Sequence, residues 1–177
     1  MKTFLLSCLL FAGTLGWAWA QPVSVLADGF DTVHLGMTLP ELEKALGESG
    51  YFLWRGLPDV SLLSKPNDSL IDVRGIDYFT RAVLQLRKGH LYVASFDLNP
   101  RQFDYYGVYT ALVKKYGPPK SLDPSLALWE DKKTRLTLEK PLTVKYLDLS
   151  IQKEIDQSSQ AGKAYQEISR EKFLELF

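Results

Sequence analysis

The residues of this chain that could do chemistry are few and far apart. His34 and His90 are the two histidines, and no H-x-x-x-H or His-carboxylate cluster of metal-ligand spacing accompanies either of them. Asp97 and Asp148 each close a strand-like run and could form a carboxylate pair for acid and base catalysis, although strand-end caps explain them better. No G-x-S-x-G elbow or P-loop occurs. We therefore expect no catalytic residue, no metal ligand and no cofactor, and a protein that is not an enzyme.

The N-terminus has the pattern of an export signal. Residues 3–15 are an apolar run behind a lysine, and the tripeptide A-W-A ending at Ala20 is a small-x-small cleavage site. The run is too short to cross a hydrocarbon core of roughly 30 Å comfortably. Cys8 superficially fits a lipid-attachment box, but cleavage beside it would leave too little apolar sequence for export. We expect cleavage after Ala20, with residues 1–20 removed, and a periplasmic protein that carries no lipid on Cys8.

Composition excludes several classes of partner. The chain is 46% hydrophobic and 24% charged, which is typical of a globular domain. Its 21 basic and 21 acidic residues balance, so no overall field favours nucleic acid or an anionic membrane. Once Cys8 leaves with the signal, thiol chemistry and disulfides are excluded. We expect no nucleic-acid partner and at most a peripheral membrane contact.

Residues 38–47 predict the first helix. Thr38 and Glu41 form a T-x-x-E capping box, and a proline stands in the first turn, where its missing donor costs nothing. Gly47 is placed to end the helix in the left-handed conformation. A helix of two to three turns is not stable alone. It must therefore pack on another element.

The next segment predicts an antiparallel meander. Its runs are rich in β-branched, aromatic and aliphatic residues, and Lys88-Gly89 supplies a tight turn between the last two. Residues 64–69 read as a loop because Pro, Asn, Asp and Ser gather there. The expected strands are 70–76, 81–86 and 91–98, with 51–56 as a possible extra one.

The same order of elements then recurs. The stretch 105–116 carries a helical apolar stripe that ends at Gly117, before two prolines. The stripe comprises Tyr105, Val108, Tyr109, Leu112, Val113 and Tyr116. Three further strands are expected at 126–130, 134–139 and 144–150. This is a degenerate repeat, because the first copy has extra residues between its helix and its hairpin.

The last segment, 151–177, is charged and poor in β-branched residues. It predicts a helical tail with a break near Ser158 to Gly162. The tail could fold back over the rest of the chain as a lid, or it could be an arm that binds a partner. Its apolar residues are Ile151, Ile155, Tyr165, Ile168, Leu174 and Phe177.

Two motifs carry a family resemblance. The run Gly36-Met37-Thr38-x-x-Glu41-Leu42-x-x-x-Leu46-Gly47 resembles the G-M-T-x-x-E-V-x-x-x-L-G opening of the SmpA/OmlA (BamE) type of outer-membrane-assembly lipoproteins. A second module of the same superfold is similar to the segment that starts at Leu112 and continues through Pro119. This segment is followed by a strand with Trp129 and by a strand with Leu136 and Leu138. That superfold includes the two-module β-lactamase-inhibitor proteins (BLIP). The resemblance implies an exported, non-catalytic protein whose sheet or loops contact another protein.

These observations predict an α+β fold of two tandem helix-on-antiparallel-sheet modules, BamE-like or BLIP-like, with a C-terminal helical tail. The expected boundaries are 21–99 for the first module, 100–150 for the second and 151–177 for the tail. The leading functional hypothesis is a protein-interaction or envelope-assembly accessory factor in the periplasm of a diderm bacterium. The alternative is a carrier for a lipid or another apolar ligand.

The candidate binding residues come from one strand and two tryptophans. Strict alternation along 91–98 places Leu91 and Val93 on one face of the strand and Tyr92, Ala94, Phe96 and Leu98 on the other. Both faces are then apolar, and the second face needs a cover. The rest of the chain, a partner or an apolar ligand could supply that cover. The candidate binding residues are Tyr92, Phe96, Leu98, Trp54 and Trp129.

Overall fold

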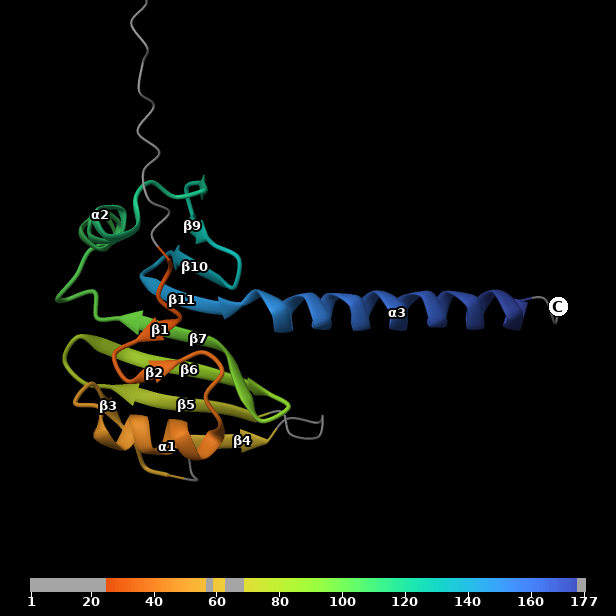
Figure 1. Ribbon diagram of the computed structural model, residues 1–177, viewed down its shortest axis with the longest axis horizontal. Coiled ribbons are helices and arrows are strands. Elements are labelled where there is room, and N and C mark those ends of the chain that lie inside the picture. Colours follow the sequence, from red (N-terminus) through yellow and green to blue (C-terminus); the bar gives the residue numbers. More distant parts are fainter. Residues whose placement is uncertain (1–24, 57–58, 63–68, 175–177) are drawn as a thin grey trace, which may run out of the picture.

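The computed structural model describes residues 25–56, 59–62 and 69–174. The expected signal peptide and Cys8 lie outside these residues, as does all of the predicted loop 64–69 except Ser69. The described chain is an α+β fold with three helices and a large antiparallel sheet (Figure 1). The sheet runs in the order β3 (Phe52–Leu53), β5 (Ser69–Gly75), β6 (Phe79–Arg87), β7 (His90–Leu98), β11 (Thr143–Asp148), β10 (Thr134–Glu139), β9 (Leu126–Glu130) and β8 (Ser121–Leu122), and β4 (Val60–Leu62) also pairs with β5.

The sheet is continuous across the two halves of the chain. The meander β5-β6-β7 and the meander β9-β10-β11 meet through their last strands, because β7 and β11 pair antiparallel with Asp97 opposite Thr143. Buried residues from both halves also belong to one core cluster, from Leu42 on α1 (Leu39–Glu48) to Leu136 on β10. One sheet and one core therefore join the halves.

Among the described residues, α1, α2 and the β1–β2 hairpin cover one face of the sheet, and none of these elements covers the other. The helices α1 and α2 (Tyr105–Tyr116) and the hairpin of β1 (Gly29–Phe30) and β2 (Val33–His34) contribute side chains to the core. Figure 1 shows β1, β2 and α1 in front of the strands. On β5, Ile71 and Val73 are fully buried, whereas Asp72 between them is exposed. We call the helix-covered side the covered face and the opposite side the open face.

The first helix begins as predicted but ends later. The backbone N–H of Thr38 donates to Glu41 at 2.7 Å, within the capping box. The prediction that Gly47 is the C-cap is wrong, because α1 continues to Glu48 and the C-cap is Ser49 with φ −72°. The Ser49 N–H donates to Ala45 at 3.0 Å, so the helix closes without a left-handed residue.

The second helix has the predicted bounds. Asp104 is its N-cap and accepts a hydrogen bond from the Gly107 N–H at 2.7 Å. Gly117 is the C-cap with φ 82°, which an L side chain rarely adopts. The whole predicted stripe packs against the core, although none of its residues is fully buried.

The hairpin of β6 and β7 contains a β-bulge that sequence alternation does not anticipate. Lys88 and Gly89 form the turn with φ 50° and 79°. Leu86 then faces Leu91, but Gln85 faces Val93, so Tyr92 is an extra residue on β7. The extra residue reverses the alternation, and Leu91 joins Ala94 and Phe96 on the covered face. The predicted grouping of Tyr92 with Phe96 is therefore wrong.

The tail is one continuous helix, α3 (Leu149–Leu174). The predicted strand 144–150 ends at Asp148, because this side chain caps α3 and accepts from the Ser150 N–H at 2.8 Å. The predicted break near Ser158 is wrong, and its hydroxyl donates back to the Ile155 carbonyl at 2.8 Å, as serines within helices do. The helix projects away from the sheet, so the lid interpretation is wrong as well (Figure 1).

Candidate functional site

The side chains with catalytic potential do not come together. His34 pairs with Asp28, with Nδ1 2.8 Å from Oδ1, and the Nδ1 of His90 lies 3.1 Å from the Lys88 carbonyl. Asp97 faces Thr143 at one end of β11, and Asp148 ends the same strand. Within the ranges that the structure describes, no three His, Cys, Asp or Glu side chains form a group that could hold a metal ion.

The five residues predicted to bind occupy three different environments. Phe96 is 1% exposed and packs in an aromatic cluster with Phe30 and Phe79, and Trp129 is 3% exposed. Both are therefore core residues. Leu98 and Trp54 are half-buried at the edge of the core, and Tyr92 alone lies on the open face.

The fixed position of Trp129 shows why it is a core residue. Its Nε1 donates to the Gly117 carbonyl at 2.9 Å, and its ring lies 6.2 Å from that of Tyr109. These contacts tie β9 to both the end and the middle of α2. A residue held in this way anchors the helix and is not available to a ligand.

Tyr92 lines a hollow on the open face. Its hydroxyl donates to the Gln85 amide oxygen at 3.0 Å across the bulge. Both side chains line a hollow of about 390 Å³ between β6 and β9. We call it the open-face hollow; its lining residues are Gln85, Tyr92, Val93, Leu126, Leu128, Arg135, Thr137, Glu139, Lys145, Leu147 and Gln152.

Apolar side chains lie on two sides of the open-face hollow, on β9 and around Val93 and Leu147. Leu126 and Leu128 alternate along β9 with the buried Ala127 and Trp129, so they point to the open face and remain half-buried. Val93 is only 7% exposed, yet it does not belong to the core cluster. Apolar surface therefore gathers where no helix covers the sheet.

Paired charges on β10 and β11 lie between these apolar groups and continue to Lys120 before β8. Glu130 accepts from Lys120 at 2.6 Å and from the Arg135 Nε at 2.7 Å, and these hydrogen bonds hold the pKa of its carboxyl below the usual value. Lys145 donates to Glu139 at 2.7 Å. The two clusters contain three bases and two acids, so a single basic group is in excess. Lys120 is 63% exposed, so part of this charge faces solvent.

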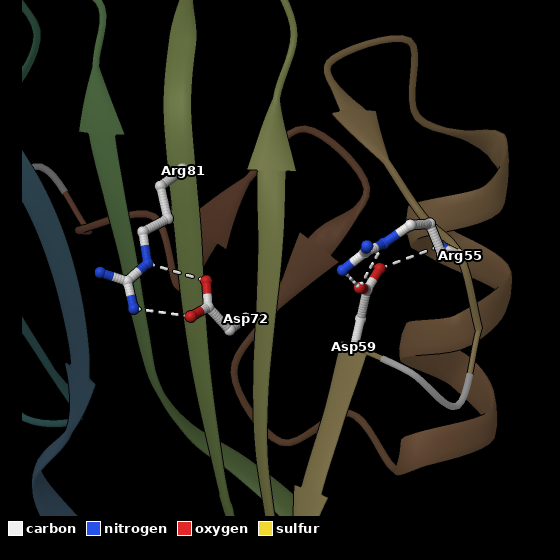
Figure 2. Close-up of polar contacts among 4 residues, drawn as sticks. All are labelled: Arg55, Asp59, Asp72 and Arg81. Atoms are coloured by element: carbon white, nitrogen blue, oxygen red, sulfur yellow. Dashed lines mark hydrogen bonds and ion pairs between the residues drawn. The ribbon is translucent and has the colours of Figure 1, made fainter.

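The pairing of charges continues along the open face to the other end of the sheet. Arg81 on β6 donates two hydrogen bonds of 2.7 Å to Asp72 on β5, and this contact lowers the pKa of the Asp72 carboxyl (Figure 2). Beside them, Arg55 holds the buried carboxylate of Asp59 through its guanidinium and its backbone N–H, the latter at 2.9 Å. The margin of the open face is therefore polar, and its charged side chains pair with one another.

The tail helix begins at the rim of the hollow. Gln152 on its first turns is a lining residue, and Lys88 in the β6–β7 turn pairs with Glu154. The Glu154 carboxyl has a lowered pKa because Lys88 donates a hydrogen bond to it. The base of α3 is therefore fixed beside the open face.

Sequence reasoning missed most of the hollow, although the signal that could find it is present. In 91–98, apolar residues occur on both faces of one strand. The same is true of 126–130, where Leu126 and Leu128 alternate with Ala127 and Trp129. Arg135, Thr137 and Glu139 likewise alternate with buried leucines on β10. Strand alternation alone does not tell which of the two sets of side chains the helices cover.

This arrangement fits contact with a protein surface. Specific interfaces combine apolar contacts with hydrogen-bonding and charged groups, and the open-face hollow presents both kinds of side chain next to one another. No helix among the described residues has both the length and the apolar character needed to cross a membrane.

Comparison with known proteins gives one match. The family model of the TP0088 domain matches residues 28–158, which include all strands of the sheet and the start of the tail helix. No curated protein and no solved structure matches the chain significantly.

Proposed function

This chain belongs to the TP0088 domain family, and from this premise we propose that it is an exported, non-catalytic protein that binds another envelope protein through the open face of its sheet. The observation that supports the proposal most directly is the open-face hollow, in which apolar side chains lie beside paired charges on a sheet face that α1 and α2 do not cover. Apolar surface left uncovered in this way is typical of interaction sites.

The charges around the hollow specify what the partner should present. Glu130 and Glu139 are already engaged by Lys120, Arg135 and Lys145, which leaves one basic group in excess. An acidic side chain next to an apolar one would match this surface, because complementary charges favour correct docking. We therefore propose that the partner inserts an apolar side chain and places a carboxylate near Lys120 or Arg135.

The order of elements supports a further proposal about the fold. Each half consists of a helix followed by a three-stranded meander, α1 with β5-β6-β7 and α2 with β9-β10-β11. We propose that these are tandem modules of the superfold shared by the BamE-type and BLIP-type proteins, with boundaries near 21–99 and 100–150. Superposition of the two halves in a crystal structure tests this; halves whose strands do not align in order would contradict it.

Export is the part of the proposal that depends on the N-terminal sequence alone. The A-W-A site predicts a mature chain that begins at Gln21 and is periplasmic. The intact mass of the protein isolated from a periplasmic fraction checks this. Retention of residues 1–20, or a lipid adduct on Cys8, would contradict it.

Site-specific crosslinking tests the binding surface. A photo-crosslinking amino acid at Leu128, in the hollow, should give one discrete protein adduct in cells. The same amino acid at Tyr106, which is 72% exposed on α2, is the matched control and should not give that adduct. Leu147→Glu should abolish the Leu128 adduct, because it places a new carboxylate in the hollow beside the apolar Val93.

The alternative function, a lipid or apolar-ligand carrier, is an outcome of the same experiment. Adducts at Leu128 whose added mass is that of a lipid, in place of a protein, would favour the carrier. Equal protein adducts at Leu128 and Tyr106 would mean that the open face is not a specific surface and would overturn the proposal.

A further inference from the structure

A second concave site lies at the end of the sheet, away from the open-face hollow. The end of β7, the loop 99–104, the start of α2 and the β10–β11 turn enclose about 670 Å³. We call this site the end pocket; its lining residues are Thr80, Asp97, Leu98, Pro100, Phe103, Asp104, Tyr105, Pro141, Leu142 and Thr143.

The wall of the end pocket is held in place by Asn99. Its side chain donates to the Asp77 carbonyl at 2.7 Å and accepts from the Arg101 N–H at 3.0 Å. Its carbonyl accepts from the N–H groups of Gln102 at 3.0 Å and Phe103 at 3.1 Å. The loop is therefore braced from both sides, and the pocket is formed before any ligand arrives, as ligand sites usually are.

Most of the lining is apolar or aromatic. The Phe103 ring is 36% exposed and stands 5.8 Å from the ring of Tyr78, which is 49% exposed. Leu98 and Leu142 form the floor, joined by a backbone hydrogen bond of 3.0 Å. A ligand would thus find aromatic faces at the rim and aliphatic side chains below.

Two carboxylates are the charged groups of the lining. Asp97 accepts from the Thr143 hydroxyl at 2.6 Å, and Asp104 accepts from the Gly107 N–H at 2.7 Å, each through Oδ1. Among the described residues, none donates a hydrogen bond to the second oxygen of either carboxylate. Arg81, the neighbour of Asp97 across β6 and β7, gives both of its side-chain hydrogen bonds to Asp72, and its charge also interacts with Asp97 without a hydrogen bond.

The rim already contacts a cation of the chain itself. The Lys140 ammonium lies over the ring of Tyr105, 5.7 Å from its centroid. An aromatic face attracts a cation at this distance through its quadrupole. The end pocket thus combines aromatic faces with carboxylate oxygens that have room for a further donor.

We propose that the end pocket binds an organic cation, a primary ammonium or guanidinium on an apolar stem. The stem lies on Leu98, Phe103 and Leu142, and the charged group donates hydrogen bonds to Asp97 and Asp104. The cation can belong to a free amine or to a lysine or arginine side chain of a peptide. This site is separate from the open-face hollow and does not depend on the function proposed for it.

Paired probes test the charge requirement. The mature chain is titrated with 2-phenylethylamine and with its neutral analogue 2-phenylethanol, and binding is followed by calorimetry and by the NMR signals of Phe103. The amine should bind at least about tenfold more tightly, because a hydrogen bond to an ionised group contributes more than about 1.4 kcal/mol, or one factor of ten. Equal affinities, or no binding of the amine, would overturn the proposal.

Isosteric variants test the residues. In the double variant Asp97→Asn and Asp104→Asn, the asparagine at 97 still accepts from Thr143 and the one at 104 is still a good N-cap, so the fold should persist while the preference for the amine disappears. The control pair Glu43→Gln and Glu48→Gln, on α1 and outside the end pocket, changes the net charge equally and should retain the preference. If the double variant melts early, Phe103→Ala replaces it and should weaken the binding of both probes. Retained preference in the double variant, or unchanged affinity in Phe103→Ala, would overturn the proposal.

Two short peptides distinguish the sources of the cation. An acetylated, amidated peptide with one central lysine is compared with the same peptide containing norleucine. Tighter binding of the lysine peptide than of the free amine assigns the site to a protein side chain, and the reverse order assigns it to a small amine. Leu128→Asp, in the open-face hollow, should leave both affinities unchanged, so this result is independent of the crosslinking experiment.

Discussion

Two neighbours on β9, Leu128 and Trp129, have opposite surroundings. Trp129 is 3% exposed beneath α2 and donates a hydrogen bond to Gly117, whereas Leu128 is half-buried in the open-face hollow. Both side chains are large and apolar, so their chemistry does not separate them. The covering layer does, because α1, α2 and the β1–β2 hairpin contribute to the core on one side of the sheet only.

The comparison extends to the whole sheet. Each strand sends alternate side chains to a face that stabilises the fold and to a face that is available to a partner. Substitutions on the covered face should therefore change stability, and those on the open face should change binding. The four predictions below test this separation, from the largest expected effect to the smallest.

The largest effect is expected from a charge on the covered face of β7. Phe96→Asp should lower the free energy of unfolding by more than about 4 kcal/mol, since it removes a buried ring and buries an unpaired carboxylate. Tyr92→Asp, on the open face, should cost about 1 kcal/mol or less. Chemical denaturation of both variants measures the difference. Equal losses would mean that the bulge does not place the two residues on opposite faces.

The next effect concerns the two neighbours on β9. Trp129→Ala should cost about 3–5 kcal/mol, as truncation of a buried tryptophan usually does, and it also removes the hydrogen bond to Gly117. Leu128→Ala is the matched control and should cost about 1 kcal/mol. With the photo-crosslinking amino acid moved to Leu126, also in the open-face hollow, the two variants should show the reverse order, because Leu128→Ala should lower the adduct yield more than Trp129→Ala. A larger stability loss for Leu128→Ala would refute the distinction between the faces.

A smaller effect separates the ends of the two helices on the covered face. Gly117→Val should cost about 1–2 kcal/mol, because Gly117 has φ 82° and a β-branched residue resists this conformation. Gly47→Ala should instead stabilise the protein by up to about 1 kcal/mol, because Gly47 lies within α1 and alanine is the better helix former. A β-carbon at Gly47 would lie 4.0 Å from Cδ1 of Trp54, an ordinary contact. Melting curves of both variants check these opposite signs.

The smallest effect is a pH dependence on the open face. Hydrogen bonds from Lys120 and Arg135 lower the pKa of the Glu130 carboxyl in the folded protein. The stabilisation is therefore complete above the unfolded pKa of about 4.3 and is lost as the pH falls through the lower, folded value. Glu130→Gln should flatten this part of the curve of unfolding free energy against pH. Glu48→Gln, at an exposed site on α1, is the control, and an identical flattening there would contradict the assignment.

Several elements could be predicted from the sequence because their signals are local. Asp104 and Gly117 mark the two ends of α2, Thr38 and Glu41 mark the start of α1, and Lys88 with Gly89 marks the hairpin turn. Each signal acts through hydrogen bonds or backbone angles within a few residues. The α+β class followed from the order of these elements.

The candidate site could be predicted only in part. The sequence placed Tyr92, Phe96 and Leu98 together on one face of β7, and of these three Tyr92 lines the open-face hollow. Phe96 and Trp129 are core residues, because the helices cover the face of the sheet on which they lie. Strand periodicity is the same whichever face is covered, so it does not predict this.

The sequence by itself determined where most helices and strands begin and end, and which residues are apolar. The tertiary structure alone decided the bulge at Tyr92, the union of β7 with β11, and the course of α3 away from the sheet. These features depend on pairing between segments distant in the chain, and one extra residue on a strand exchanges its two faces. For this reason the open-face hollow, whose walls come from β6, β7, β9, β10, β11 and α3, exists only in the folded protein.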